Sequence, residues 1–240
     1  MTPHRIAMWS GPRNLSTAMM RSFGNRPDCT VVDEPLYAAY LAETGLDHPG
    51  RDDVIASQPT DWRVVCGELT EGPVATPLQY QKHMTHHLLP GIDRAALAGL
   101  HHAFLVRDPV RVLTSYAKVR AEPTLVDLGL PQQVELFERY GGPVVDAADV
   151  LRDPARTLGL LCSALGIGYD EAMLSWPAGP RETDGAWAPH WYAGVEASTG
   201  FAPYSPGSGD PLPDRLQLLL ERCLPYYDAL AAHRLRLEDT

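Results

Sequence analysis

The sequence predicts an α/β fold in which helices cover a central, mainly parallel sheet of five strands. Short apolar segments typical of buried strands alternate along the chain with segments of helical spacing, which is the pattern of a parallel sheet with covering helices. The 240 residues are 45% hydrophobic and 21% charged, which is ordinary for a globular protein with a sizeable core. No internal repeat or second domain is evident, so we expect one domain over residues 1–240.

Each predicted element rests on a local pattern. The strands are short apolar runs at residues 5–9, 29–34, 74–80, 101–106 and 143–146. The helices cover residues 18–23, 35–41, 62–69, 109–120, 154–165 and 212–237, the last interrupted at Pro225. Pro35 and Pro109 suit the first turn of a helix. Thr60 and Asp108 suit N-caps, and Gly166 suits a helix end.

Residues 176–213 differ from the rest of the chain because they combine many prolines with several aromatic residues. A stretch of this length without regular structure is usually functional or disordered. Aromatic side chains argue against disorder because they can bury apolar surface. We therefore expect a loop or lid that packs over a binding site.

The net charge of −10 bears on partners and location. Nucleic acids and anionic membranes select basic surfaces, so neither is expected as a partner. The sequence has no apolar run long enough to span a membrane and no basic, then apolar, N-terminal leader. Its four cysteines are scattered, which favours reduced thiols over disulfides or a zinc site. We expect a cytoplasmic protein, and the sequence leaves open whether it forms a homo-oligomer.

The first loop is the most informative segment. The first predicted strand runs into Ser10-Gly11-Pro12-Arg13-Asn14-Leu15-Ser16-Thr17 and then into a helix. A sharp strand-to-helix turn directs the free N–H groups of the helix N-terminus at one place, which binds anions. Arg13 adds a cation there, and Ser16 and Thr17 add hydroxyl donors. The alternative is a plain strand–helix turn with a surface arginine.

This loop differs from an ATP-binding loop. The nucleotide motif is Gly-x-x-x-x-Gly-Lys-Ser/Thr, in which the lysine reaches the β- and γ-phosphates. Counting from Gly11, Ser16 takes the place of the second glycine and Thr17 takes that of the lysine. The loop therefore predicts an oxyanion site without the parts needed to hydrolyse a triphosphate.

A second candidate anion site follows the strand at residues 101–106. Parallel sheets bind ligands at the carboxyl ends of their strands, which is where Arg107 lies. Ser115 lies about two turns into the next helix, and an arginine and a hydroxyl can together bind a phosphate. Alternatively, Arg107 pairs with Asp108 or Asp33 as part of the scaffold.

These two segments together resemble a known family. Residues 11–17 resemble the 5′-phosphosulfate loop of sulfotransferases that use 3′-phosphoadenosine 5′-phosphosulfate (PAPS), and residues 107–116 resemble their 3′-phosphate site. Residues 144–166 are similar to the family's later strand and helix. The resemblance is closest to a sulfotransferase-like subgroup with a Ser-Gly-Pro-Arg-Asn-Leu-Ser-Thr loop, and residues 185–201 also resemble that subgroup.

The resemblance implies a three-layer P-loop NTPase-like fold. It also implies transfer of a sulfuryl group from PAPS to a hydroxyl or amine of a small-molecule acceptor, with adenosine 3′,5′-bisphosphate (PAP) as the product and without a metal. Arg13, Ser16 and Thr17, with the rest of the first loop, would hold the 5′-phosphosulfate. Arg107 and Ser115 would hold the 3′-phosphate.

Two regions depart from the pattern of this family. Arg13 stands where many members that sulfate small molecules have lysine. In the lid, Arg181 and Gly185 are the residues that would serve as the family's basic, glycine-rich motif.

The acceptor must lose a proton to a base, and the leaving oxygen needs a cation or donor. Arg13 suits the second role because its charge does not titrate away. Glu34 is the favoured base because it ends a strand at the same cleft, although a salt bridge to Arg13 or Arg107 is the alternative. Lys82 and His83 follow the third predicted strand and resemble the Lys and His region of other members, so they are the rival candidates.

Two other functions stay open on the sequence. An ATP-dependent kinase or phosphotransferase on the same fold is disfavoured by the missing lysine at Thr17. A non-catalytic nucleotide-binding protein would keep the anion site without the chemistry. His83, His86 and His87 have helical spacing, but no carboxylate or cysteine completes a metal signature, so we expect a solvated or substrate-facing helix and no metal.

Overall fold

A five-stranded sheet lies at the centre of the molecule. The computed structural model describes residues 2–120, 122–206 and 212–236. The strands are β1 (His4–Ser10), β2 (Cys29–Asp33), β3 (Leu78–Met84), β4 (His101–Val106) and β5 (Val144–Asp146). Their order is β2-β3-β1-β4-β5, and every neighbouring pair is parallel. The predicted α/β class with a parallel five-stranded sheet is confirmed.

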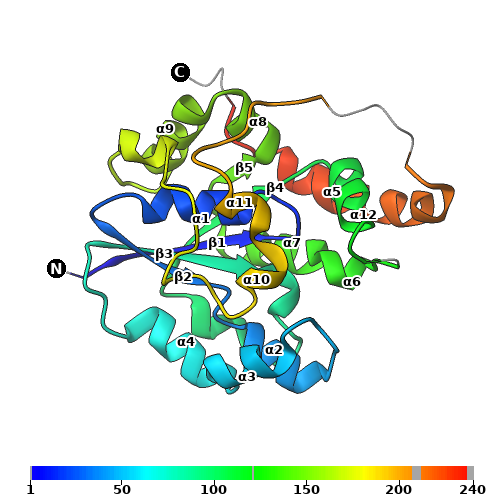
Figure 1. Ribbon diagram of the computed structural model, residues 1–240, viewed down its shortest axis with the longest axis horizontal. Coiled ribbons are helices and arrows are strands. Elements are labelled where there is room, and N and C mark those ends of the chain that lie inside the picture. The colour runs from blue at the N-terminus through cyan, green and yellow to red at the C-terminus, as the bar shows by residue number, and fades with distance from the viewer. Residues whose placement is uncertain (1, 121, 207–211, 237–240) are drawn as a thin grey trace.

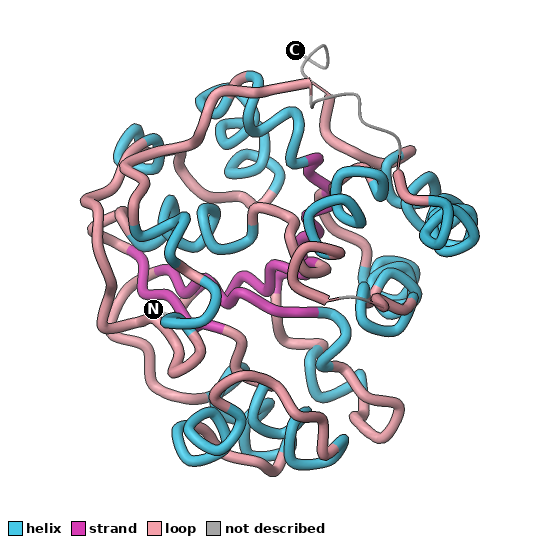
Figure 2. Tube along the Cα trace, turned by 45° about the vertical axis from the view of Figure 1, so that its right-hand side comes forward, coloured by secondary structure: helices cyan, strands magenta, loops and turns pink. Residues whose placement is uncertain are grey.

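Helices cover both faces of this sheet. They are α1 (Ser16–Gly24), α2 (Tyr37–Thr44), α3 (Arg51–Ser57), α4 (Trp62–Glu71), α5 (Pro109–Tyr116), α6 (Leu125–Leu128), α7 (Leu130–Tyr140), α8 (Ala147–Arg152), α9 (Pro154–Ala164), α10 (Ala188–Trp191), α11 (Ala193–Glu196) and α12 (Gln217–Ala231). Short 3-10 helices are η1 (Thr85–His87), η2 (Arg94–Leu97), η3 (Glu171–Leu174) and η4 (Asp214–Leu216). Figure 1 shows α1, α8 and α9 on one side of the sheet and α4 on the other, and Figure 2 shows the strands running between helices.

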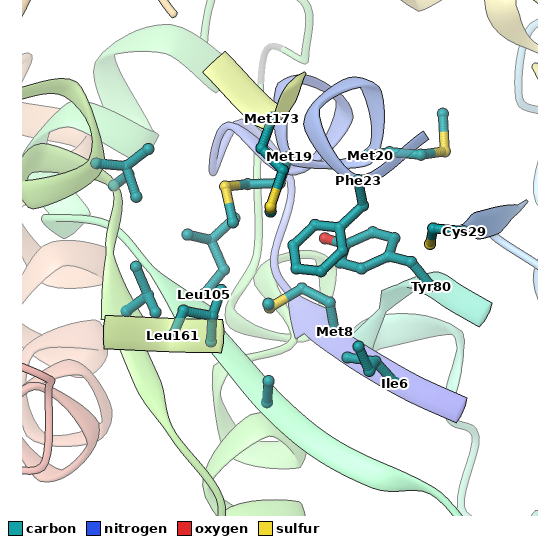
Figure 3. Packing of buried hydrophobic residues seen from close by; sticks show 14 of the residues in the cluster. Ile6, Met8, Met19, Met20, Phe23, Cys29, Tyr80, Leu105, Leu161 and Met173 are labelled. Atoms are coloured by element: carbon teal, nitrogen blue, oxygen red, sulfur yellow. The ribbon is translucent and has the colours of Figure 1, made fainter. Parts of the chain in front are cut away.

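Alternating residues of the strands build the two cores. In β1, Ile6 and Met8 belong to the core beneath α1 and α9, whereas Trp9 belongs to the core beneath α4 and α7. Phe23 of α1 stacks on Tyr80 of β3 with ring centroids 4.3 Å apart (Figure 3). Because both faces of the strands are covered, a ligand can reach them only at their ends.

The third strand differs most from the prediction, because it begins and ends four residues later than the predicted run at 74–80. All its residues are buried, including polar ones such as Gln81, whose Nε2 donates to the Leu69 carbonyl at 2.9 Å. Because β3 contains several polar residues, it lacks the apolar run by which a buried strand is predicted. Lys82 and His83 therefore lie inside β3 and point to opposite faces of the sheet, instead of following it together.

Several helix boundaries also differ from the prediction. Asp61, and not Thr60, caps α4, because its carboxylate accepts from the Arg63 N–H at 2.9 Å. Asp108 caps α5 as predicted, but that helix ends at Tyr116 and not at residue 120. The last helix continues through Pro225.

The segment predicted as a lid contains the short helices α10 and α11. Its residues 207–211, and residue 237 of the predicted last helix, lie outside the described part of the chain. Among the described helices, none is both long enough and apolar enough to cross a membrane.

Candidate active site

A cavity of about 580 Å³ opens at the carboxyl ends of the central strands. Its walls come from six parts of the chain. These are the first loop and α1 (residues 12–18), the ends of β2 and β3 (Glu34, Lys82, Met84), the α2 region (Tyr37, residues 47–49), η1 (His86, His87), the end of β4 with α5 and the residues after it (Arg107, Ser115, Tyr116, Val119, Arg120) and the segment 187–202 (Trp187, Trp191, Tyr192, Gly194, Val195, Ser198, Gly200, Phe201, Ala202). Most of the predicted site residues therefore share one cavity. Gly11 lies next to this set and packs against the Leu128 carbonyl, which a Cβ at Gly11 would approach to 2.5 Å.

Two hydrogen bonds join the first loop to the end of β4. Arg107 Nη1 donates to the carbonyl oxygen of Arg13 at 2.6 Å. Arg13 Nε donates to Ser115 Oγ at 2.9 Å. The two segments predicted as separate anion sites are thus in direct contact at one rim of the sheet.

The N-terminus of α1 is open to the cavity. Leu15 occupies the N-cap position and supplies no side-chain cap, and the first turn contains no acidic residue. The first N–H groups of a helix have no partner within the helix, so they are available to an anion here. Asn14 fastens the loop to the sheet, because its Nδ2 donates to the Leu105 carbonyl at 3.3 Å.

The backbone around the cavity is locally strained. In the described part of the chain, the non-glycine residues with positive φ are Arg13 (61°), Leu15 (70°) and Glu34 (39°). All of them line the cavity. Such conformations cost free energy and persist where the surrounding structure fixes them, which is typical of functional sites.

Arg13 and Arg107 are the cationic residues at this rim of the cavity. Within the described residues, neither Arg13 nor Arg107 forms an ion pair with a carboxylate. Burial, together with the nearby charges of Arg111 and Arg13, lowers the pKa of Arg107. Guanidinium groups that repel one another in the absence of an anion form a site ready to accept one. The ion pairs of Arg107 with Asp108 or Asp33 that the scaffold alternative expects are not formed among the described residues.

Glu34 lines the same cavity and pairs with Lys82. The Lys82 Nζ to Glu34 Oε1 distance is 2.6 Å, so the alternative pairing of Glu34 with Arg13 or Arg107 is also wrong. Burial raises the pKa of Glu34, and the charge of Lys82 opposes that shift. Burial alone would lower the pKa of Lys82, but Asp33 and Glu34 outweigh it, so Lys82 stays an ammonium group.

The histidines are placed differently from the prediction. His83 does not line the cavity, because its ring is buried on the other face of β3 and stacks on Trp9 with centroids 4.1 Å apart. His86 and His87 line the cavity, but they lie in a buried 3-10 turn and not on a solvated helix. His83 is therefore withdrawn as a candidate base. No group of three or more His, Cys, Asp or Glu residues among the described ones could hold a metal ion.

Arg181 also lies apart from the cavity. Its Nη2 donates to the Pro177 carbonyl at 3.1 Å, and its N–H donates to Asp184 at 2.7 Å. Both contacts are made within its own loop, and Arg181 does not line the cavity. The expected contact of Arg181 with a nucleotide is therefore withdrawn.

The buried imidazoles predict a loss of stability in mild acid. Burial lowers the pKa of His83 and of His86 from 6.5 to about 3. Below pH 6.5 these imidazoles therefore bind protons in the unfolded chain but stay neutral in the folded chain. The free energy of unfolding therefore falls as pH falls. Between pH 7.5 and 5.5 each imidazole is expected to remove about 1.4 kcal/mol from the free energy of unfolding. Urea denaturation at both pH values measures the difference, which His83→Gln should reduce. Equal free energies at the two pH values would contradict the burial of neutral imidazoles.

The sequence match decides the family. The family description "Sulfotransferase domain" matches residues 4–234 of the chain. This chain belongs to the sulfotransferase domain family. Two curated relatives from Arabidopsis thaliana are named "Branched-chain-amino-acid aminotransferase-like protein 1" and "Branched-chain-amino-acid aminotransferase-like protein 2". They are 39% and 37% identical to it over 96% and 95% of the chain. The chain spans 42% and 41% of their lengths, so it corresponds to less than half of each relative.

Solved structures with the same fold are also sulfotransferases. The sulfotransferase domain of the Synechococcus PCC 7002 olefin synthase superposes with a TM-score of 0.55 at 20% identity, covering 92% of this chain and 94% of that one. The sulfotransferase from Alicyclobacillus acidocaldarius superposes with a TM-score of 0.56 at 13% identity, covering 98% of both chains. These similarities confirm the expected sulfotransferase-type fold.

Two residues of this sulfotransferase domain that contact Lys82 were missed as site residues. Asp33 accepts from Lys82 Nζ at 2.9 Å, and the Tyr192 hydroxyl accepts from it at 2.6 Å. The position of Asp33 at a strand end was a usable signal, since the neighbouring Glu34 was selected on that ground. Tyr192 gave a weaker signal as one of several aromatic residues that could line an acceptor pocket, because nothing in a proline-rich segment shows which of them turns inward.

Proposed function

We propose that this sulfotransferase domain transfers the sulfuryl group of PAPS to a hydroxyl or amine of a small-molecule acceptor. The observation that carries the proposal is the contact between the two arginine-bearing segments, in which Arg107 donates to the Arg13 carbonyl at 2.6 Å. A donor with acidic groups on both its 5′ and 3′ oxygens needs two cationic positions at one rim. The guanidinium groups of Arg13 and Arg107, which form no ion pair with a described carboxylate, meet that need.

Different residues are proposed to bind the 5′ end and the 3′ end of PAPS. The open N-terminus of α1, with the hydroxyls of Ser16 and Thr17, would hold the 5′-phosphosulfate. Arg107 and Ser115 would hold the 3′-phosphate. Arg13 lies between them, because its Nε is bonded to Ser115 while its terminal nitrogens are left for the 5′ end.

The transfer itself needs positioning, a base and a cation. The acceptor atom forms a bond to sulfur while the bond from sulfur to the bridging oxygen of PAPS breaks, as in other in-line transfers. Glu34 takes the proton that the acceptor loses. Arg13 stabilises the charge that develops on the departing oxygen, because its guanidinium stays protonated throughout.

The part of the cavity that we assign to the acceptor has aromatic walls. Tyr37 and Trp187 contact edge to face with ring centroids 5.1 Å apart. Burial lowers the pKa of His86 to about 3 and holds that of His87 well below its usual value, so both imidazoles are neutral at pH 7. These features favour an uncharged acceptor with an apolar or aromatic face.

The proposal is tested by incubating the protein with PAPS and a panel of alcohols, phenols and amines. Mass spectrometry is expected to find PAP together with a sulfated acceptor, and the yield is expected to persist in EDTA. A parallel reaction with ATP and Mg²⁺ tests the kinase alternative and is expected to give no phosphorylated product. Unchanged PAPS across the panel, or phosphate transfer from ATP, would overturn the proposal.

A further inference from the structure

A buried group of three polar side chains connects the segment that covers the cavity to the ends of β2 and β3. We call residues 185–202 the covering segment. Asp33 at the end of β2 and Lys82 in β3 are register partners, and Tyr192 belongs to the covering segment. Their exposed fractions are 5%, 1% and 3%. Polar groups buried this deeply destabilise the fold unless they are hydrogen-bonded.

The hydrogen bonds of Lys82 use every proton it carries. An ammonium group has three N–H donors. Lys82 Nζ donates to Asp33 Oδ1 at 2.9 Å, to Glu34 Oε1 at 2.6 Å and to the Tyr192 hydroxyl at 2.6 Å. No donor is left for a substrate, so Lys82 acts through the groups that it holds.

The Tyr192 hydroxyl is equally saturated. It accepts from Lys82 Nζ and from Trp187 Nε1, the latter at 3.0 Å, and it donates to Asp33 Oδ2 at 2.7 Å. A hydroxyl has one donor and two acceptor positions, so all are occupied. The N–H of Gly185 also donates to Asp33 Oδ2, at 3.1 Å. The covering segment is thus fastened to the strand ends at the same ammonium group that holds Glu34.

The groups facing Glu34 come from several elements. Lys82 of β3 is the cation among them, and Asp33 of β2 is a second carboxylate. His87 of η1 has its Nε2 3.9 Å from Glu34 Oε2, and burial keeps its imidazole neutral. Tyr37 of α2 stays a neutral phenol, because burial and the charge of Glu34 raise its pKa. Lys82 is therefore the group that favours the ionised form of Glu34.

We propose that Lys82, Asp33 and Tyr192 form one positioning unit that both orients Glu34 and holds the covering segment closed over the cavity. The proposal rests on the proposed function, because Glu34 serves as a base only if the chain transfers sulfuryl groups. Lys82 supplies the charge that favours the ionised form of Glu34. Tyr192 joins the covering segment to the same ammonium group. A single buried group thereby fixes the position of Glu34 and the position of the covering segment that lines the acceptor site.

Hydrogen exchange of the full chain without nucleotide tests the docking role. In Tyr192→Phe and Lys82→Met, backbone amides of residues 185–202 are expected to exchange about tenfold faster than in the unsubstituted protein, because a charge-assisted bond is lost. Tyr169→Phe is the matched control, since Tyr169 is 37% exposed and lies outside the cavity. Exchange at the unsubstituted rate in both variants would overturn the docking role.

Titration of Glu34 by carbon NMR tests the positioning of the base, with the signal assigned from Glu34→Gln. Lys82→Met is expected to raise the titration midpoint of Glu34 by about 1–3 pH units, because a cation in contact is removed. If Lys82→Met does not fold, the double variant Asp33→Asn/Lys82→Met removes both charges; its midpoint is still expected to rise, but by less, because the charge of Asp33 itself raises the pKa of Glu34. An unchanged midpoint in the folded variant would overturn the role of Lys82.

These two measurements use neither PAPS nor an acceptor, so they separate the inference from the proposed function. A protein that ignores PAPS but shows both expected changes refutes sulfuryl transfer and keeps the positioning unit. A protein that transfers sulfuryl groups but shows neither change refutes the positioning unit. In an active enzyme, Lys82→Met is also expected to move the acid limb of the kcat profile to higher pH, with the affinity for PAP within about twofold of the unsubstituted value.

Discussion

Replacing Glu34 with glutamine is expected to lower turnover by about 10²- to 10⁴-fold. Glutamine keeps the size of the side chain and can still accept a hydrogen bond from Lys82 Nζ, which lies 2.6 Å from Glu34 Oε1. It cannot take a proton from the acceptor. The affinity for PAP should stay the same, because Glu34 pairs with Lys82 and is not one of the proposed phosphate ligands. Turnover is measured as PAP released from PAPS with an acceptor found in the panel.

Glu68→Gln on α4 is the matched control for this experiment, because Glu68 is exposed and outside the cavity. It removes the same charge and should leave turnover unchanged. If Glu34→Gln keeps full turnover, Glu34 is not the base. If it weakens PAP binding as much as it lowers turnover, its effect is on the fold of the site and not on proton removal.

Replacing Arg107 with alanine is expected to weaken PAP binding by about 10- to 100-fold, which is the range for losing charged hydrogen bonds to a phosphate. ADP lacks the 3′-phosphate, so its weaker binding should change little. The variant therefore loses the preference for PAP over ADP as well as affinity. Isothermal calorimetry with both nucleotides measures the two effects.

Arg63→Ala is the matched control for Arg107→Ala. Arg63 lies on α4 with 70% of its side chain exposed and does not line the cavity. It removes one positive charge from the molecule without touching the rim, so it reports any non-specific effect of net charge on nucleotide affinity. Equal loss of PAP affinity in both variants would mean that Arg107 acts through the overall field and not at a 3′-phosphate site.

Much of the fold could be predicted from the sequence because apolar runs mark strands that are buried on both faces. The strand at β4 and its N-capped helix α5 were found in this way, with Asp108 as the cap. The start and end of β3 were missed because that strand has no such apolar run. Gln81, Lys82 and His83 are polar yet buried, and Lys82 has a partner as distant in sequence as Tyr192.

The difference between local patterns and long-range contacts also explains which site residues were predicted. The first loop and Arg107 were predicted because strand ends and glycine turns are local signals. Their contact at 2.6 Å follows from the strand order, which places β1 beside β4. The pairing of Lys82 with Tyr192 joins residues 110 positions apart and has no local signal.

The strained backbone of the site was also outside the reach of sequence patterns. Arg13, Leu15 and Glu34 adopt positive φ, a conformation usually taken by glycine. Residue type gives no hint of it, because the surrounding contacts impose it. One of these contacts, from Arg107 to the Arg13 carbonyl, is long-range and also forms the rim of the proposed donor site.

The most direct measurement is a crystal structure of the protein with PAP. It is expected to place the 5′-phosphate at the N-terminus of α1, beside Arg13, and the 3′-phosphate within hydrogen-bond distance of Arg107 and Ser115. A nucleotide bound elsewhere, or one whose 3′-phosphate points away from Arg107 into solvent, would contradict a two-ended donor site at this rim.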